Sequence, residues 1–290
     1  MICNLCPRRC GAARTEEEGF GRCGMPWLPV VARAALHFWE EPCISGRRGS
    51  GTVFFSGCPL GCVFCQNGRI SRENFGKTVT VERLREIFLE LIGQGAHNIN
   101  LVTPTHFAPA IRRALAEPLP VPVVWNSGGY ERVETLRTLE GRVQIYLPDL
   151  KYADSALAAA CSGAPDYFDV ARAAIREMVR QTGPCVFDGE GLLRRGVVIR
   201  HLMLPGALEN TRRVMDWVAG AFPPGTVLFS LMSQYTPQPG AEGMLRRRVT
   251  GGEYRAALRY MENVGITAGY RQDSSSAREE YTPPFDLTGV

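Results

Sequence analysis

The sequence predicts an α/β protein built on a parallel sheet and preceded by a small segment organised by cysteines. From residue 52 onward, short apolar runs rich in β-branched residues alternate with segments of helical period. The chain has 290 residues and 45% hydrophobic content, which is enough to bury a full core. Seven of the ten cysteines fall in two groups, within residues 3–23 and 58–65. These three observations define the fold class.

Strands and helices are expected at regular intervals along the main region. The predicted strands are residues 52–56, 99–103, 121–126, 143–147, 197–204, 226–232 and 266–269. One helix follows Thr80 as its cap, and others are expected at residues 107–116, 130–140, 166–181, 207–221 and 252–264. Residues 183–196 are expected to form an inserted hairpin. Six successive βα units imply right-handed crossovers, and both an open doubly wound sheet and a barrel satisfy the pattern.

The first cysteine group has the spacing Cys3-x2-Cys6-x3-Cys10-x12-Cys23 in a glycine-rich stretch with few apolar side chains. Such a stretch cannot build a core, so thiolates around a metal are expected to hold it together. Zinc, a rubredoxin-like single iron and an auxiliary iron–sulfur cluster all remain open. Among these we favour one closed mononuclear site with four cysteine ligands.

Two domains are predicted. Residues 1–45 form a small rubredoxin- or zinc-ribbon-like metal-binding unit, and residues 46–290 form the main α/β domain. The aromatic residues in the stretch 37–39 are expected to pack between the two. Cys43, Cys161 and Cys185 stand alone in the sequence and are interpreted as structural.

Composition excludes several classes of partner. The net charge is +4 and the arginines are scattered, which argues against a nucleic-acid surface. No stretch reaches the roughly 20 apolar residues of a membrane span, and the first residues lack the pattern of a secretory signal. Clustered cysteines in such a chain indicate bound metal in a reducing compartment, so a cytoplasmic location is expected.

The second cysteine group is the sharpest motif in the sequence. Cys58, Cys62 and Cys65 have the spacing C-x3-C-x2-C on one short loop, followed by Gln66 and Asn67. Three thiolates can each bind one iron of a cubane cluster, and no fourth cysteine stands nearby to take the last iron. A structural zinc knuckle is the alternative, but zinc prefers paired C-x2-C units and closed four-coordination. The spacing therefore favours a cluster with one open coordination position.

This motif, with Phe64 just before its third cysteine, resembles the signature of the radical S-adenosylmethionine (radical SAM) superfamily. The resemblance implies a partial (β/α)6 barrel of the TIM type, with the cysteine loop after the first strand. It also implies a [4Fe-4S] cluster that cleaves S-adenosylmethionine reductively to methionine and a 5′-deoxyadenosyl radical. Cys58, Cys62 and Cys65 would then be both the iron ligands and the catalytic centre.

Functional side chains of a parallel barrel gather at the carboxyl ends of its strands, and these ends carry polar residues here. A zwitterionic amino acid joined to a nucleoside needs both charge signs nearby, which Asp149 and Lys151 supply. Over residues 50–275 the strand ends also resemble one branch of the superfamily, the pyruvate formate-lyase activating enzymes. Among these the four-cysteine N-terminal segment is a feature of uncharacterised homologues.

The branch resemblance implies further contacts with the cofactor. It places Asp149 and Lys151 around the carboxylate of S-adenosylmethionine, and Thr103 and Thr105 near its ammonium group. It places a monovalent cation beside the same carboxylate, at Asn126, Ser127, Leu147 and Asp149. The complete set of expected cofactor-binding residues is Phe64, Asn67, Thr103, Thr105, Asn126, Ser127, Asp149, Lys151 and His201.

The function expected from this resemblance is activation of a glycyl-radical enzyme, by removal of a hydrogen atom from a backbone glycine. The implied partners are that protein substrate and an electron donor such as flavodoxin or ferredoxin. Radical modification of another peptide or a small molecule is the enzymatic alternative. A metal or electron-transfer protein without substrate chemistry is the alternative from a different class.

Overall fold

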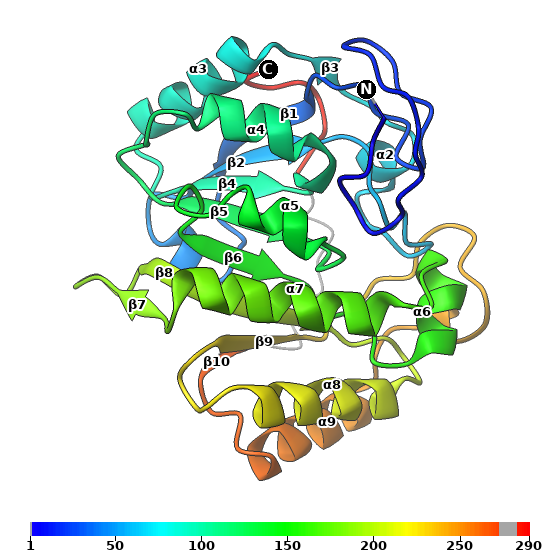
Figure 1. Cartoon of the computed structure of the whole chain (residues 1–290). Helices are drawn as coiled ribbons and strands as arrows, with labels where there is room; N and C mark the ends of the chain where they lie inside the picture. The colour runs from blue at the N-terminus through cyan, green and yellow to red at the C-terminus, as the bar shows by residue number, and fades with distance from the viewer. Residues whose placement is uncertain (1, 273–282) are drawn as a thin grey trace.

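One sheet organises the computed structural model, which describes residues 2–272 and 283–290 (Figure 1). The strands run in the order β10-β9-β8-β6-β5-β4-β2-β1-β3, and β7 pairs with β8 beside this path. Their bounds are β1 (Val30–His37), β2 (Ser50–Phe55), β3 (Lys77–Thr78), β4 (Ile99–Val102), β5 (Val123–Ser127), β6 (Ile145–Pro148), β7 (Val186–Phe187), β8 (Leu193–Leu202), β9 (Leu228–Met232) and β10 (Gly269–Arg271).

Neighbouring strands along the path β2-β4-β5-β6-β8-β9-β10 are all parallel, which confirms the predicted α/β fold with a partial barrel, and β7 joins β8 antiparallel beside this path. β1 pairs antiparallel with both β2 and β3, so β3 and β10 form the two edges of the sheet. Because these edges do not pair with each other in the described residues, the barrel stays open on one side.

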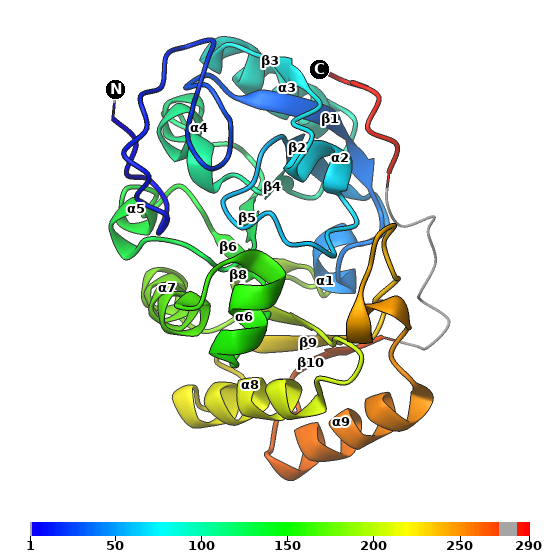
Figure 2. The same cartoon turned by 90° about the vertical axis from the view of Figure 1, so that its right-hand side faces the viewer.

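Helices cover the outer face of this sheet (Figure 2). The helices that follow the parallel strands include α3 (Val81–Gly93), α4 (Ala108–Ala114), α5 (Val133–Arg137), α7 (Tyr167–Thr182), α8 (Leu208–Ala221) and α9 (Gly251–Asn263). Others are α1 (Pro42–Ser45), α2 (Gly68–Ser71), α6 (Ser155–Ser162) and the 3-10 turns η1 (Thr105–Phe107) and η2 (Gly243–Arg246). Each main crossover helix packs an apolar face on the strands, as the 3.6-residue period predicts.

The helix α3 illustrates how the local sequence specifies an element. The side chain of Thr80 accepts a hydrogen bond from the backbone N–H of Arg83, which satisfies one free donor of the first turn. Leu84, Ile87 and Phe88 on one face are buried. The predicted cap and buried face are confirmed.

β1 and α6 are among the elements that were not expected from the sequence. β1 lies within the stretch assigned to the N-terminal unit, yet it pairs with β2 in the main sheet, so the predicted boundary at residue 45 cuts through the sheet. Its alanine-rich sequence has weak β propensity, and pairing with a buried strand decides its conformation. The second element, α6, follows Asp154, whose side chain caps it, and ends at Gly163 in the left-handed conformation.

The N-terminal segment 2–29 holds two isolated β-bridges and no regular strand or helix. Its large apolar side chains Ile2 and Phe20 are exposed to solvent and therefore do not contribute to a hydrophobic core. It lies against α5, where Thr135 donates a hydrogen bond to the carbonyl of Leu5 (2.6 Å). Within the described residues, no helix combines the length and apolar character needed to cross a membrane.

Candidate active site

A cavity of about 470 Å³ lies at the carboxyl ends of the parallel strands. Its wall combines the loop after β2 with the ends of β4, β5, β6, β8 and β9. Most of the residues predicted from the sequence line it: Cys58, Cys62, Cys65, Phe64, Asn67, Thr103, Asn126, Ser127, Asp149 and Lys151. Side chains spread over nearly a hundred positions of the sequence therefore meet in one site, because parallel strands end at one edge.

The three cysteines come close enough to influence one another. Burial, together with the neighbouring charges of Cys62 and Cys65, raises the pKa of the Cys58 thiol to about 12. The pKa of Cys65 is raised for the same two reasons. Bound iron would offset this repulsion by holding the sulfurs as thiolates.

The surroundings of these cysteines fit an iron–sulfur cluster. The hydroxyl of Ser162 donates a hydrogen bond to the sulfur of Cys62 (2.9 Å), a contact typical of cluster ligands. The side-chain oxygen of Asn67 is buried and has no protein partner in the described residues, so it is available to a ligand in the cavity. No three potential ligands among these residues converge as on a single metal ion. A cubane does not require this, because each thiolate binds a different iron.

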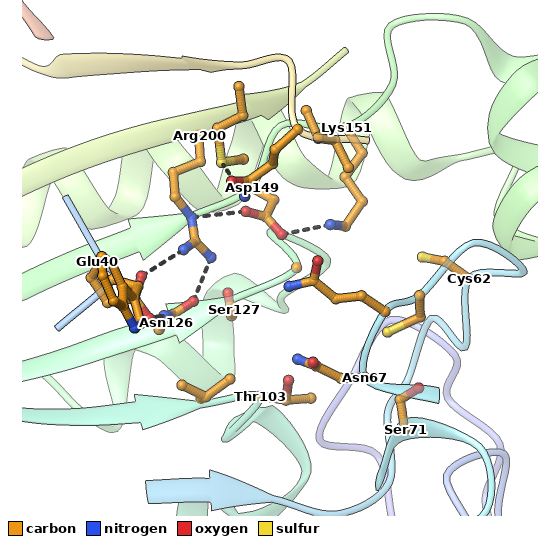
Figure 3. Close-up of a pocket in the computed structure, with 18 of the residues that line it drawn as sticks. Glu40, Cys62, Asn67, Ser71, Thr103, Asn126, Ser127, Asp149, Lys151 and Arg200 are labelled. Atoms are coloured by element: carbon orange, nitrogen blue, oxygen red, sulfur yellow. Dashed lines mark hydrogen bonds and ion pairs between the residues drawn. The ribbon is translucent and has the colours of Figure 1, made fainter. Parts of the chain in front are cut away.

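A network of charged side chains forms the opposite wall of the cavity (Figure 3). Asp149 accepts from Lys151 Nζ at 2.5 Å and from Arg200 Nε at 3.0 Å. Arg200 also donates to Glu40 Oε2 (2.9 Å) and to Asn126 Oδ1 (2.6 Å). These groups come from β5, β8, the loop after β1 and the loop after β6, and Figure 3 shows Asp149 between the two cations, with Cys62 across the cavity.

The network determines the charges at the site. Burial alone would raise the pKa of Asp149, but Lys151 and Arg200 outweigh this effect and hold that pKa below its ordinary value. Burial would likewise lower the pKa of Lys151, yet the charges of Asp149 and the cluster cysteines raise it. Lys151 is therefore an ammonium ion with Asp149 on one side and the cysteines on the other. Such a cation is suited to bind a carboxylate.

Glu40 and Glu41 were missed by the sequence analysis. Glu40 Oε1 accepts hydrogen bonds from the amides of Asn100 and Asn126, both at 3.1 Å. Glu41 is buried, and its Oε2 has no hydrogen-bond partner in the described residues. Burial raises the pKa of Glu41, against the opposing charge of Arg200. Two adjacent acids before Pro42 were the available signal, but nothing in the sequence placed them beside the end of β8.

The position implied for a monovalent cation holds a side chain instead. The oxygens of Asn126 and Asp149 bind the guanidinium of Arg200. Arg200 therefore supplies positive charge between these two residues, and Glu40 balances it from the other side. The expected aromatic packing is also corrected, because Phe38 and Trp39 are 48% and 60% exposed and line the cavity.

The two threonines predicted at the end of β4 differ. Thr103 lines the cavity and has a φ of 59°, a left-handed conformation that a β-branched residue rarely adopts. Thr105 lies outside the cavity lining. It is buried and donates to Glu131 (2.6 Å), a carboxyl whose pKa burial raises to about 7. The turn η1 thus directs the Thr105 hydroxyl to a core carboxyl, and its expected contact with the cofactor stays a prediction.

His201 also lies away from the cavity. The preceding residue, Arg200, faces the cavity, and successive residues of a strand point to opposite faces. His201 is fully buried, with Nδ1 2.6 Å from the carbonyl oxygen of Leu150 and Nε2 3.0 Å from the hydroxyl of Thr211. It lies outside the cavity lining and joins β8 to its neighbours, and its expected contact with the cofactor stays a prediction.

The N-terminal cysteines gather in one region. Burial raises the pKa of Cys6 to about 11, with added contributions from the charges of Cys23, Cys3 and Cys10. Their side chains do not converge as on a single metal ion in the described residues. A metal at this site stays a prediction.

Comparison with known proteins points to the same superfamily that the cysteine motif resembles. The sequence profile of the Radical SAM superfamily matches residues 52–218. An uncharacterized protein of Methanocaldococcus jannaschii is 30% identical over 280 residues, covering 92% of this chain and 76% of the relative.

Solved structures show the same fold at low identity. Methylornithine synthase (PylB) has a TM-score of 0.51 at 17% identity, covering 83% of this chain and 72% of that one. SuiB of Streptococcus suis, bound to its precursor peptide SuiA, has a TM-score of 0.50 at 11% identity, covering 75% of this chain and 47% of that one. With the profile match over more than half of its length and the cysteine loop at the end of β2, this chain belongs to the radical SAM superfamily.

Proposed function

We propose that this radical SAM protein removes a hydrogen atom from a polypeptide, and that its target is a backbone glycine of a glycyl-radical enzyme. Membership of the superfamily supports a [4Fe-4S] cluster and S-adenosylmethionine as cofactors. When bound, the cluster supplies one electron that cleaves S-adenosylmethionine to methionine and a 5′-deoxyadenosyl radical, which leaves as 5′-deoxyadenosine after taking the hydrogen atom. The protein residues bind, orient and shield these groups.

Six residues of the cavity have a specific role in this proposal. Cys58, Cys62 and Cys65 would hold three irons of the cluster, and the fourth iron would be available to S-adenosylmethionine. Lys151 binds the carboxylate, while Asp149 keeps the lysine charged and directed into the cavity. Asn67 offers its unpartnered amide oxygen to a ligand.

The pairing of the cavity's charged side chains, apart from Glu41, with other protein groups is the observation that carries the polypeptide proposal. Arg200, His201, Arg271 and Asp273 are the candidate anchors for a small polar substrate. Arg200 is bound to Asp149 and Glu40, His201 is buried, and Arg271 pairs with Glu262 (2.8 Å). Asp273 lies outside the described residues. A pocket for a small polar molecule needs several convergent polar anchors, and these groups are already engaged.

The mouth of the cavity suits a polypeptide better. Its lining includes the exposed rings of Phe38 and Trp39 and the amides of Gln234, Gln238 and Gln272. Amide side chains and aromatic surface recognise backbone and loop residues without requiring a particular charge. The open edge of the barrel gives a protein loop lateral access. SuiB, which has a similar fold, is described as binding a precursor peptide.

The other functions lead to different observable outcomes. Methylornithine synthase has a similar fold, and its name refers to a small product, so chemistry on a small molecule is the second candidate. A metal or electron-transfer protein would cleave no S-adenosylmethionine. We also propose a second metal, iron or zinc, at Cys3, Cys6, Cys10 and Cys23, a flavodoxin or ferredoxin as electron donor, and a cytoplasmic location.

Electron paramagnetic resonance tests the proposal directly. The reconstituted protein is incubated anaerobically with reductant, S-adenosylmethionine and a candidate glycyl-radical enzyme. We expect a glycyl doublet on the partner, and deuterium in 5′-deoxyadenosine when the partner carries α-deuterated glycine. The variant with Cys58, Cys62 and Cys65 all changed to alanine is the control and should cleave no cofactor. Turnover of a low-molecular-weight substrate with no protein partner present would overturn the proposal.

A further inference from the structure

The N-terminal segment touches the cluster loop directly. Gly57, which precedes the first cluster cysteine, has a φ of +77°. A Cβ added to it would lie 2.3 Å from Cγ of Met25 and 2.9 Å from the carbonyl oxygen of Cys23. Glycine is therefore required both by the backbone conformation and by the close approach of the N-terminal chain. The two cysteine groups, distant in the sequence, are neighbours in the fold.

Arg8 makes the most extensive contact across this boundary. Its Nε donates to the carbonyl of Pro59 (2.9 Å), and its Nη2 donates to the carbonyls of Ser162 (2.6 Å) and Leu60 (3.4 Å). Its Nη1 donates to the carbonyl of Gly163. One guanidinium thus connects two carbonyls of the cluster loop with two at the end of α6.

The chemistry of these carbonyls explains why an arginine is there. Ser162 is the last residue of α6, and the final carbonyls of a helix have no partner within it. They also carry the negative end of the helix dipole, which favours a cation. A guanidinium presents its donors in a fixed planar fork, which suits several acceptors at once, whereas an ammonium is a point charge. The ring of Tyr130, 5.4 Å from the guanidinium carbon, adds a cation–π contact.

The end of α6 in turn contacts the cluster ligands. The hydroxyl of Ser162 donates to the sulfur of Cys62 (2.9 Å) and lies 2.7 Å from the hydroxyl of Tyr152. A hydroxyl has one proton, so Ser162 donates to the sulfur while accepting from Tyr152. The backbone N–H of Val63 donates to the carbonyl of Cys161 (2.9 Å), which holds the same loop to the same helix end. The position of α6 therefore determines the hydrogen bond received by one cluster thiolate.

We infer that Arg8 is a positioning residue for the catalytic cluster, because it ties the cluster loop to the end of α6 and so keeps the Ser162 hydroxyl on the sulfur of Cys62. Hydrogen bonds to the sulfurs of an iron–sulfur cluster stabilise its more negative, reduced form and raise its reduction potential. The N-terminal segment therefore tunes the electron-accepting step through Arg8. This inference rests on the proposed cluster at Cys58, Cys62 and Cys65.

Four variants separate positioning from charge. Arg8→Gln removes the fork, and Arg8→Lys keeps the charge but loses the fork. Ser162→Ala removes the hydroxyl alone. Arg9→Gln is the matched control, since Arg9 is the exposed neighbour in the same segment and carries the same charge.

Hydrogen exchange on the full-length protein, before reconstitution, tests the tie itself. We expect Arg8→Gln to lose amide protection at residues 60–65 and at the end of α6, whereas Arg9→Gln keeps it. This readout needs no cluster, cofactor or substrate, so it is independent of the proposed function. Unchanged protection in Arg8→Gln would overturn the inference.

The midpoint potential of the reconstituted cluster tests the consequence. Arg8→Gln and Ser162→Ala should each shift it to more negative values, and the double variant should shift it no further than Ser162→Ala alone. Arg8→Lys, which keeps the charge, should shift the midpoint potential less than Arg8→Gln does. Two outcomes would contradict the positioning role. Arg8→Gln could shift the potential as much in the Ser162→Ala background as in the parent, or Arg9→Gln could cause the same shift as Arg8→Gln. Either result would show a general effect of lost charge.

Discussion

Lys151 is the side chain whose surroundings define its role most closely. It is one of two lysines in the chain, and it is 17% exposed between Asp149 and the cluster cysteines. Its charge is held in place by a carboxylate that Arg200 also binds. Asp149 would therefore keep one cationic partner if Lys151 were removed, and the wall of the cavity would remain.

Lys151→Ala should weaken binding of S-adenosylmethionine about tenfold or more, because a charge-assisted hydrogen bond contributes roughly 1.5 to 3 kcal/mol. Equilibrium binding to the cluster-loaded protein measures this effect. Lys77→Ala, which removes the other, exposed lysine, is the matched control and should bind normally. An unchanged dissociation constant for Lys151→Ala would exclude Lys151 from the cofactor site.

At the scale of elements, His201 shows how one side chain joins three segments. It lies on β8, contacts the loop after β6 through Leu150 and contacts α8 through Thr211. Burial lowers its pKa from 6.5 to about 4, more than its hydrogen bond to Leu150 opposes, so the ring is neutral in the folded protein at pH 7. The residue stabilises the barrel wall behind the cavity.

This lowered pKa predicts a dependence of stability on pH. As the pH falls below 6.5, His201 becomes protonated in the unfolded chain, whereas in the folded chain it stays neutral down to about pH 4. The contribution of neutral His201 to the free energy of unfolding is thus complete above pH 6.5. It is lost as the pH falls towards 4, by at most about 1.4 kcal/mol per pH unit. His201→Gln should reduce the slope of unfolding free energy between pH 6.5 and 5, measured by urea unfolding before reconstitution. Equal slopes in variant and parent would contradict the assignment.

At the scale of the whole molecule, the two cysteine groups are neighbours in the fold, but each consists of its own set of cysteine side chains. The N-terminal group lies on a segment with little core of its own, whereas the cluster loop follows a fully buried strand. Loss of an N-terminal ligand should therefore destabilise that segment without removing a ligand of the catalytic cluster.

Cys6→Ala should lower the total metal content and expose residues 1–29 to proteolysis, while the iron and sulfide of the catalytic cluster remain. Metal and sulfide analysis after anaerobic reconstitution measures both. Cys185→Ala, which removes a cysteine outside both groups, should keep the full content. Loss of the catalytic cluster together with the N-terminal metal would show that the two sites are not independent.

The sequence alone determined the parts of this protein that depend on local pattern. The spacing of Cys58, Cys62 and Cys65 places three thiols on one loop, and the alternation of strands and helices requires a parallel sheet that ends beside that loop. The cap of α3 at Thr80 is equally local. Such features are readable because the atoms that interact are close along the chain or related by a fixed period.

Only the tertiary structure decided the features that depend on which surfaces meet. Glu40 reaches Arg200 across 160 positions, and Arg8 reaches Ser162 across 154. Strand pairing assigned β1 to the sheet, and one residue of register separates Arg200 in the cavity from His201 in the core. Each of these outcomes was selected by packing and by the need to pair buried charges and carbonyls. No local preference encodes that selection, because the partners are chosen only when the whole chain has folded.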